Sequence, residues 1–205
     1  MNTLTTTDTL PVMEAFYTLQ GEGFHQGRAA YFIRLGGCNV GCHWCDVKES
    51  WDINAHPAVA VSTLVAQASQ HEGRLAVITG GEPAMHHLDS LTTSLKAAGF
   101  QTNIETSGVY PLTGTWDWVC FSPKKFKAPD PDIFEKANEL KAIIYNKSDF
   151  DFAEMYAQNL RPDCKLYLQP EWSRSAEMLP LIIEYIKDNP KWRISLQVHK
   201  YMNIP

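Results

Sequence analysis

GGCNVGCHWCD, residues 36–46, holds three of the five cysteines of this 205-residue chain. Cys38, Cys42 and Cys45 are spaced C-x3-C-x2-C, and glycines precede and separate them. Three thiolates suit a soft metal centre, but a closed structural zinc site needs four ligands. A four-iron cluster has four irons that each require a ligand, so three cysteines leave one iron open. The spacing therefore predicts an iron–sulfur cluster whose fourth position takes a substrate or a cofactor.

The alternative is a non-catalytic zinc module in which His43 supplies the fourth ligand, although His43 is crowded between Cys42 and Cys45. The other two cysteines, Cys120 and Cys164, are remote and lie in apolar segments, where a buried free cysteine is the ordinary expectation. A zinc module also gives no reason for polar residues at successive strand ends.

Short apolar segments alternate with amphipathic ones along the chain. Strands are expected at 30–35, 74–79, 101–106, 116–121, 140–145, 165–169 and 193–199, and helices at 62–71, 87–98, within 149–158 and at 174–188. This alternation predicts an α/β fold with mostly parallel strands. We expect residues 1–11 to be a flexible lead-in and 12–205 to be one domain. Residues 48–60 are compatible with a helix or with a loop over the cysteines.

Glycines and polar residues follow one predicted strand after another. They are Gly36, Gly37 and the cysteine loop, GGEP (80–83), SGVY (107–110), SPKK (122–125), PEW (170–172), and the pair His199 and Lys200. In parallel sheets and barrels the carboxyl ends of the strands converge on one mouth. The order of these residues therefore predicts a single site at that edge of the sheet.

The bulk properties exclude some classes of function. The net charge is −5 and lysines and arginines form no long run, which argues against a nucleic-acid or anionic-membrane surface. No apolar run approaches the ~20 residues that span a bilayer. The first residues lack the basic and apolar blocks of a signal peptide, so we expect a reducing cytoplasm.

The cysteine spacing, Trp44 before the last cysteine and GGEP at the next strand end resemble the radical S-adenosylmethionine (SAM) superfamily. Longer stretches are similar to the 7-carboxy-7-deazaguanine synthase family of the queuosine pathway: 14–38, 42–46, VITGGEP (77–83), IETSG (104–108), SPK (122–124), LQP (168–170) and LQVHKYMNIP (196–205). The resemblance runs from Glu14 to the last residue. It implies an incomplete, pared-down (β/α) barrel, because a full superfamily barrel is longer than this chain.

The resemblance also implies the reaction, a ring contraction of 6-carboxy-5,6,7,8-tetrahydropterin to 7-carboxy-7-deazaguanine with loss of ammonia. Cys38, Cys42 and Cys45 would ligate a 4Fe-4S cluster. SAM would contact Trp44, Cys45, Asp46, Gly80, Gly81, Glu82, Ser107, Ser122, Pro123, Lys124, Gln169, Pro170, Glu171 and Trp172. The pterin would contact Leu19, Gln20, Gly21, Glu22, Arg34, Thr79, His199 and the terminal Pro205. Of these, Glu22, Arg34 and His199 are the expected catalytic residues, because Glu22 can accept pterin N–H bonds and Arg34 can bind a carboxylate through two bonds.

The family further implies magnesium, a homodimer and an electron donor such as flavodoxin or ferredoxin. Val47 departs from the family pattern, because a threonine hydroxyl usually ligates magnesium there and valine has no oxygen. We therefore expect magnesium binding to be weakened or dispensable. The rival within the superfamily is a glycyl-radical-enzyme activating protein, which does not explain TLQGEG (18–23), Arg34 or HKYMNIP (199–205).

Overall fold

The computed structural model describes residues 8–205, and the strands in this range form one mixed sheet. Its order is β3-β1-β2-β4-β5-β6-β7-β8-β9. β1 pairs antiparallel with β2 and β3, whereas each neighbouring pair from β2 to β9 is parallel. The expected α/β class with mostly parallel strands is confirmed. The strands are β1 (Thr9–Leu19), β2 (Ala29–Leu35), β3 (Ala58–Ala60), β4 (Leu75–Gly80), β5 (Gln101–Thr106), β6 (Trp118–Phe121), β7 (Glu139–Ile144), β8 (Lys165–Pro170) and β9 (Trp192–Ile194).

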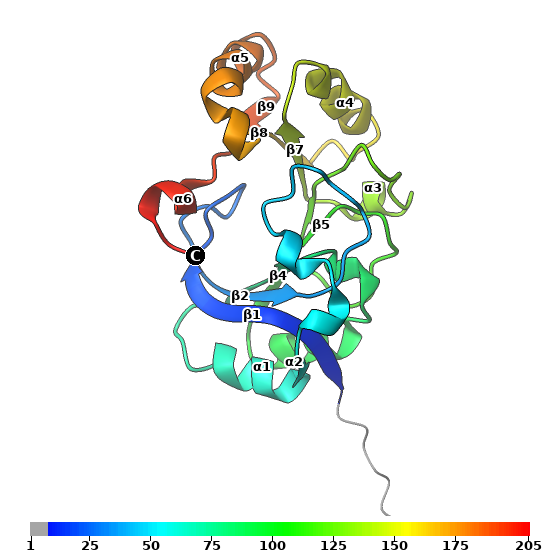
Figure 1. The fold of residues 1–205 in the computed structure, drawn as a ribbon, viewed down its shortest axis with the longest axis vertical. Coiled ribbons are helices and arrows are strands. Elements are labelled where there is room, and N and C mark those ends of the chain that lie inside the picture. Colours follow the sequence, from blue (N-terminus) through cyan, green and yellow to red (C-terminus); the bar gives the residue numbers. More distant parts are fainter. Residues whose placement is uncertain (1–7) are drawn as a thin grey trace, which may run out of the picture.

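Helices α1 to α5 cover the outer side of this curved sheet, whereas α6 lies at its opening beside the C-terminus (Figure 1). Apolar residues one helical turn apart place the covering helices there, because such residues share one helix face. Leu91 and Leu95 of α2, and Met178 and Ile182 of α5, are all buried against the sheet. Within residues 8–205, every helix is too short or too polar to span a bilayer. The helices are α1 (Val61–Ala68), α2 (Asp89–Ala97), α3 (Ile133–Lys136), α4 (Ser148–Ala157), α5 (Ser175–Asp188) and α6 (Val198–Met202).

The two faces of the sheet differ in what they bury. The large apolar core lies between the sheet and the helices and includes Ile33, Ile78 and Ile104. A much smaller cluster on other strand positions contains Ala30, Leu75 and Val77. A parallel strand that is buried on both faces consists of consecutive apolar residues, and β4 is an example. The remaining strand positions, and the strand ends, are left for polar side chains.

The sheet does not close into a barrel, because β3 and β9 are its two edges. The turn after β1 reaches across this opening instead. Gly23 N–H donates to Ser195 Oγ at 3.0 Å, and Val198 N–H donates to the Gly21 carbonyl at 3.0 Å. The incomplete barrel implied by the sequence is therefore confirmed, and the turn after β1 touches the segment that follows β9.

The expected strand at 193–199 is wrong beyond Ile194. β9 ends there, and His199 lies in the short helix α6. Ser195 explains the change, because its hydroxyl donates to Gln169 Oε1 at 2.6 Å and accepts the Gly23 N–H. The Ser195 N–H still donates to the Leu168 carbonyl at 2.9 Å, so the ladder ends at this residue, where the side chain is tied to Gln169 and to the turn after β1.

The expected lead-in at 1–11 is also too long, because β1 begins at Thr9 and Leu10 is buried. Residues 1–7 of that lead-in lie outside the described residues. The range 48–60, which the sequence left open, contains two short 3-10 turns, Lys48–Ser50 and Ile53–Ala55, followed by β3. Helix α3 had no sequence signal and was not expected.

Candidate active site

The carboxyl ends of the strands surround a pocket of about 430 Å³, a typical size for a small-molecule site. Pro123 is buried and is not part of the lining of this pocket. The predicted residues that do line it are Leu19, Gln20, Gly21, Glu22, Arg34, Cys38, Cys42, Trp44, Cys45, Asp46, Thr79, Gly80, Gly81, Glu82, Ser107, Ser122, Lys124, Gln169, Pro170, Glu171, Trp172, His199 and Pro205. The structure therefore brings residues from the whole length of the described chain to one place.

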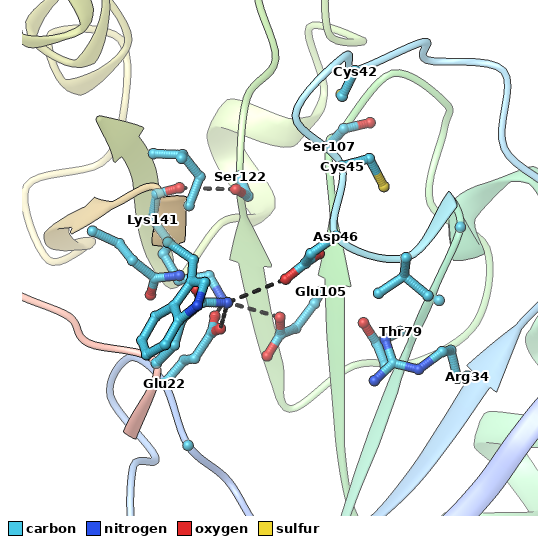
Figure 2. A pocket seen from close by; sticks show the side chains of 18 of the residues that line it. Glu22, Arg34, Cys42, Cys45, Asp46, Thr79, Glu105, Ser107, Ser122 and Lys141 are labelled. Atoms are coloured by element: carbon cyan, nitrogen blue, oxygen red, sulfur yellow. Dashed lines mark hydrogen bonds and ion pairs between the residues drawn. The ribbon is translucent and has the colours of Figure 1, made fainter. Parts of the chain in front are cut away.

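Lys141 of β7 lies between two carboxylates in the pocket wall (Figure 2). Its Nζ is 2.5 Å from Glu22 Oε2 and 2.9 Å from Glu105 Oε2. Gln197 Nε2 donates to the second oxygen of Glu22 at 3.0 Å, and Gln20 Nε2 donates to the second oxygen of Glu105 at 2.9 Å. Each carboxylate is held at both oxygens, so its position is set by the protein before a ligand binds.

The charges in this group determine its pKa values. Burial alone would raise the pKa of Glu22, but attraction to the Lys141 ammonium and hydrogen bonds from Lys141 and Gln197 outweigh it and lower this pKa to about 2. Burial would lower the pKa of Lys141, yet attraction to Glu105 and Glu22 holds it well above its ordinary value. Two carboxylates share one ammonium, so this part of the pocket keeps a negative charge and free acceptor capacity. It therefore favours the edge of a ligand that offers N–H donors.

Arg34 and Thr79 lie on the side of the pocket away from Lys141 (Figure 2). They are neighbours in the parallel ladder of β2 and β4. Arg34 Nε donates to Glu14 Oε1 at 2.6 Å, which fixes the guanidinium through one of its five N–H donors. An arginine held in this way is suited to bind a carboxylate with its other donors.

Glycines allow the end of β4 to lie directly against the cysteine loop. Gly80 has φ of +128°, a conformation that side chains rarely adopt, and a Cβ there would overlap the Leu35 backbone. A Cβ on Gly81 would overlap the Gly37 carbonyl and lie 2.9 Å from the Cβ of Cys38. The Gly81 N–H donates to the Leu35 carbonyl at 2.9 Å. These contacts determine where the first cysteine of the loop lies.

Glu82 is buried, with 1% of its surface exposed, and ties the end of β4 to the end of β5. One oxygen accepts the Thr106 hydroxyl at 2.5 Å and the Ala84 N–H at 3.1 Å. The other accepts the Ser107 N–H at 2.8 Å and the Ser107 hydroxyl. Four protein donors occupy this carboxylate, so Glu82 and Ser107 shape the pocket by holding its loops.

The three loop cysteines fit an iron–sulfur cluster by their chemistry. Cys38, Cys42 and Cys45 all line the pocket, and the Cys45 N–H donates to the Cys42 carbonyl at 3.1 Å. In the described part of the chain no three His, Cys, Asp or Glu side chains are arranged to hold a single metal ion. A cluster places each thiolate on a different iron, so its ligands need not converge on one point. The donor set suits a cluster better than a zinc ion completed by His43.

His199 reaches the pocket from α6 and packs on Gly21. A Cβ on Gly21 would overlap the His199 imidazole, which explains the glycine in the QGEG turn. Burial lowers the pKa of His199. The Ile204 N–H donates to the His199 carbonyl at 3.1 Å, so the last residues fold back and Pro205 lines the pocket. The C-terminus consequently lies beside the end of β1 (Figure 1).

Lys124 and Trp44 line another part of the pocket together. Lys124 Nζ donates to Ser122 Oγ at 2.7 Å and lies 5.2 Å from the centre of the Trp44 ring. Burial lowers the pKa of Lys124. Gln169 is buried and lines the same pocket, where its Oε1 accepts the Ser195 hydroxyl. This side of the pocket combines an aromatic face with fixed polar groups, as a nucleoside requires.

Sequence reasoning missed Glu105, Lys141 and Gln197. Glu105 lies within the strand QTNIET and Lys141 within LKAIIY. A charged residue inside a buried parallel strand needs a partner of opposite charge. The presence of Glu105 and Lys141 in two such strands could therefore have indicated an ion pair. Gln197 lies in the segment wrongly expected to be a strand, and although it belongs to LQVHKYMNIP (196–205), the resemblance gave it no role.

No family model matches the chain. The chain is 56% identical over 196 residues to a 7-carboxy-7-deazaguanine synthase of Flavobacterium psychrophilum, which covers 96% of this chain and 93% of that protein. It is 50% identical over 194 residues to a 7-carboxy-7-deazaguanine synthase of Synechocystis sp., and this match covers 95% of this chain and 93% of that protein. It is 36% identical over 222 residues to a 7-carboxy-7-deazaguanine synthase of Escherichia coli, and this match covers 95% of this chain and 98% of that protein.

Solved structures agree with these relatives. The crystal structure of QueE from Escherichia coli superposes with a TM-score of 0.82 at 33% identity, and covers 92% of this chain and 93% of that chain. The crystal structure of Streptococcus suis SuiB bound to precursor peptide SuiA has a TM-score of 0.55 at 12% identity. This match covers 77% of this chain and 46% of that chain. The second likeness is one of fold alone.

Proposed function

The chain belongs to the 7-carboxy-7-deazaguanine synthase family, and we propose that it makes 7-carboxy-7-deazaguanine for queuosine biosynthesis as a radical SAM carbon–nitrogen lyase. In the proposed reaction the ring of 6-carboxy-5,6,7,8-tetrahydropterin contracts and one ammonia leaves. The observation that carries the proposal is the distribution of charge in the pocket. Arg34 lies on one side, and Glu22 and Glu105 lie around Lys141 on the other.

This distribution matches the two ends of the pterin. The substrate carboxylate would bind Arg34, while its amino group and ring N–H would donate to Glu22 and Glu105. A hydrogen bond to a charged group contributes about 1.5–3 kcal/mol, so a ring without these N–H groups would bind much more weakly. His199 and Thr79 line the same pocket and would limit how the ring can lie.

The cofactors fit the remaining part of the pocket. Cys38, Cys42 and Cys45 would ligate the 4Fe-4S cluster. Reductive radical chemistry that removes a hydrogen atom from the substrate is what the cluster and SAM supply when bound. The chain's own residues would hold the reactants and exclude water. Of the residues expected to contact SAM, those that would hold it are Trp44, Asp46, Gly80, Gly81, Ser122, Lys124 and Gln169–Trp172. Cys45 would instead ligate the cluster, Glu82 and Ser107 bond to each other and hold the loops, and Pro123 lies outside the lining.

Magnesium does not fit the side chains that follow the last cysteine. Val47 has no oxygen. Asp46 Oδ2 is 3.2 Å from Lys200 Nζ and accepts Gln197 Nε2 at 3.3 Å. The carboxylate that a hard cation would need is therefore paired with an ammonium group. The proposed reaction has no step that uses magnesium.

We further propose that the protein works in the cytoplasm as a homodimer and receives electrons from a flavodoxin or a ferredoxin. A reducing compartment keeps the three loop thiols available as ligands. The rival function, activation of a glycyl-radical enzyme, requires a mouth open to a protein loop. Here α6 and Pro205 border the pocket, which favours a small substrate.

Isothermal titration under anaerobic conditions tests the proposal. The reconstituted protein should bind 6-carboxytetrahydropterin roughly 100-fold more tightly than tetrahydropterin without the carboxylate, a difference of about 2.7 kcal/mol. Arg34→Met should remove most of this preference, and Glu22→Gln should weaken both ligands alike. Equal affinity of the unaltered protein for the two pterins would contradict the proposal.

A further inference from the structure

The turn after β6 contacts the cysteine loop, because the Phe126 ring centre lies 6.3 Å from that of Trp44 and Lys127 bonds to Asn39. Lys124 and Lys127 pair as an antiparallel bridge, so Lys125 and Phe126 form the tip of a tight turn. Lys124 is directed toward Trp44, whereas Phe126 is 42% exposed. An exposed phenylalanine at the tip of a turn has no role in the core.

His43 joins this tip to the cysteines. It lies between Cys42 and Cys45 in the sequence and is exposed. Its ring centre is 5.4 Å from that of Phe126 and 5.5 Å from that of Tyr145, and both contacts are edge-on. Aromatic side chains thus form a continuous group from the surface to the loop that holds the thiols.

Three lysines accompany this aromatic group. Lys127 Nζ donates to Asn39 Oδ1 and to the Tyr110 hydroxyl, both at 3.1 Å. Lys125 pairs with Asp149 at 2.5 Å, and Lys147 is exposed two residues beyond Tyr145. Within residues 8–205, neither Lys127 nor Lys147 forms an ion pair. Lys127 and Lys147 therefore add two positive charges beside the aromatic group that no carboxylate of the described residues neutralises, although the chain has a net charge of −5.

We propose that this aromatic–basic patch is the docking surface for a small acidic carrier protein that delivers one electron to the cluster. The patch consists of His43, Lys125, Phe126, Lys127, Tyr145 and Lys147. The inference rests on the proposed function, which requires an electron from outside. In the transfer the reduced carrier loses one electron and the cluster gains one, and no bond forms or breaks.

The arrangement has the features of a transient interface. An aromatic centre supplies contact area and a charged rim steers the partner, so the sign of the rim selects an acidic protein. None of the six patch residues lines the pocket. A carrier bound there would lie next to the cysteine loop and leave the substrate pocket open.

Stopped-flow reduction of the reconstituted holoenzyme by reduced flavodoxin, without pterin, tests the patch. The double variant Lys127→Glu/Lys147→Glu should slow the second-order reduction of the cluster roughly tenfold at low salt, while reduction by dithionite stays unchanged. Lys165→Glu/Lys187→Glu makes the same change of charge elsewhere and should stay within about twofold of the unaltered protein. Phe126→Ala should slow the reduction of the cluster by flavodoxin without changing how that rate depends on salt.

Reduction of the double variant by flavodoxin at the unaltered rate would overturn the proposal. It would also be overturned if the double variant changed only the sedimentation of the protein, because the patch would then be a contact between two copies of this chain. Cluster reduction is read without pterin, so a failure to form deazaguanine would count against the proposed function and leave this result intact.

Discussion

Lys141 Nζ lies 2.5 Å from Glu22 Oε2, although the two residues are 119 positions apart in the sequence. Only 5% of the Lys141 side chain and 13% of the Glu22 side chain are exposed. The pair fastens the turn after β1 to β7. That turn also contacts Ser195 and Val198 across the open edge of the sheet, so one ion pair serves both the pocket and the fold.

Lys141→Met tests this pair, because it removes the ammonium and keeps the aliphatic shape. Removing one partner of a buried ion pair costs roughly 3–5 kcal/mol, and two carboxylates here would lose their cation. We expect the free energy of unfolding at neutral pH to fall by that order in urea denaturation. Lys165→Met, at the first residue of β8, should change it by less than about 0.5 kcal/mol. An unchanged value for Lys141→Met would show that the pair has no structural role.

The pH dependence of stability should show the charge on Glu22. Its pKa falls from an ordinary 4.5 to about 2 in the folded protein, mainly because Lys141 outweighs the effect of burial. A carboxyl group with a lowered folded pKa stabilises the protein above its unfolded pKa and loses this effect as the pH falls. The stability advantage of the unaltered protein over Glu22→Gln should therefore shrink between about pH 5 and pH 2. An advantage that grows on acidification would give the opposite sign.

The contact between Gly81 and the cysteine loop predicts an effect on the cluster. A Cβ at position 81 would overlap the Gly37 carbonyl, so Gly81→Ala should displace Cys38 and lower the iron bound per chain after reconstitution. Gly27→Ala is the control, because Gly27 has φ of +85° and nothing lies within 4 Å of its Cβ position. The control should cost about 1–2 kcal/mol of stability and keep full iron. Equal iron in both variants would refute the proposed coupling.

Much of the fold was predictable because the parallel strands are apolar and end in glycines or polar residues. β4 reads as LAVITG followed by GEP, and both its identity and its place at the pocket follow from that pattern. β1 was not recognised, because its residues are largely half-buried and it contains Pro11. Its partners β2 and β3 lie on either side of it, and local sequence does not reveal such pairing.

The site was predictable where its residues belong to a spacing motif or to a stretch that resembles a family, and Lys141, inside the apolar strand β7, belongs to neither. The cysteines and Arg34 were found from spacing and from the resemblance to a family. Lys141 was overlooked because the sequence around it does not show its partner. The structure shows that Glu22, 119 positions away in the sequence, pairs with it. The segment RISLQVH looks like a strand by alternation, yet the bonds of Ser195 redirect it.

Val47 predicts how turnover responds to magnesium. With no oxygen at position 47 and Lys200 paired to Asp46, turnover should show no saturable activation across millimolar magnesium. Val47→Thr adds a hydroxyl of nearly the same shape and should introduce such activation. Val47→Ala, which adds no oxygen, is the matched control and should behave like the unaltered protein. Strong saturable activation of the unaltered protein would show that the missing hydroxyl is unimportant.

Mass spectrometry of an anaerobic turnover tests the central claim most directly. The protein would be reconstituted with iron and sulfide and mixed with SAM, dithionite and 6-carboxy-5,6,7,8-tetrahydropterin. Formation of 7-carboxy-7-deazaguanine without stoichiometric loss of SAM is the predicted result, and the Lys141→Met variant should form much less. Cleavage of SAM with no deazapurine would contradict the proposed substrate and favour an activating enzyme that acts on another protein.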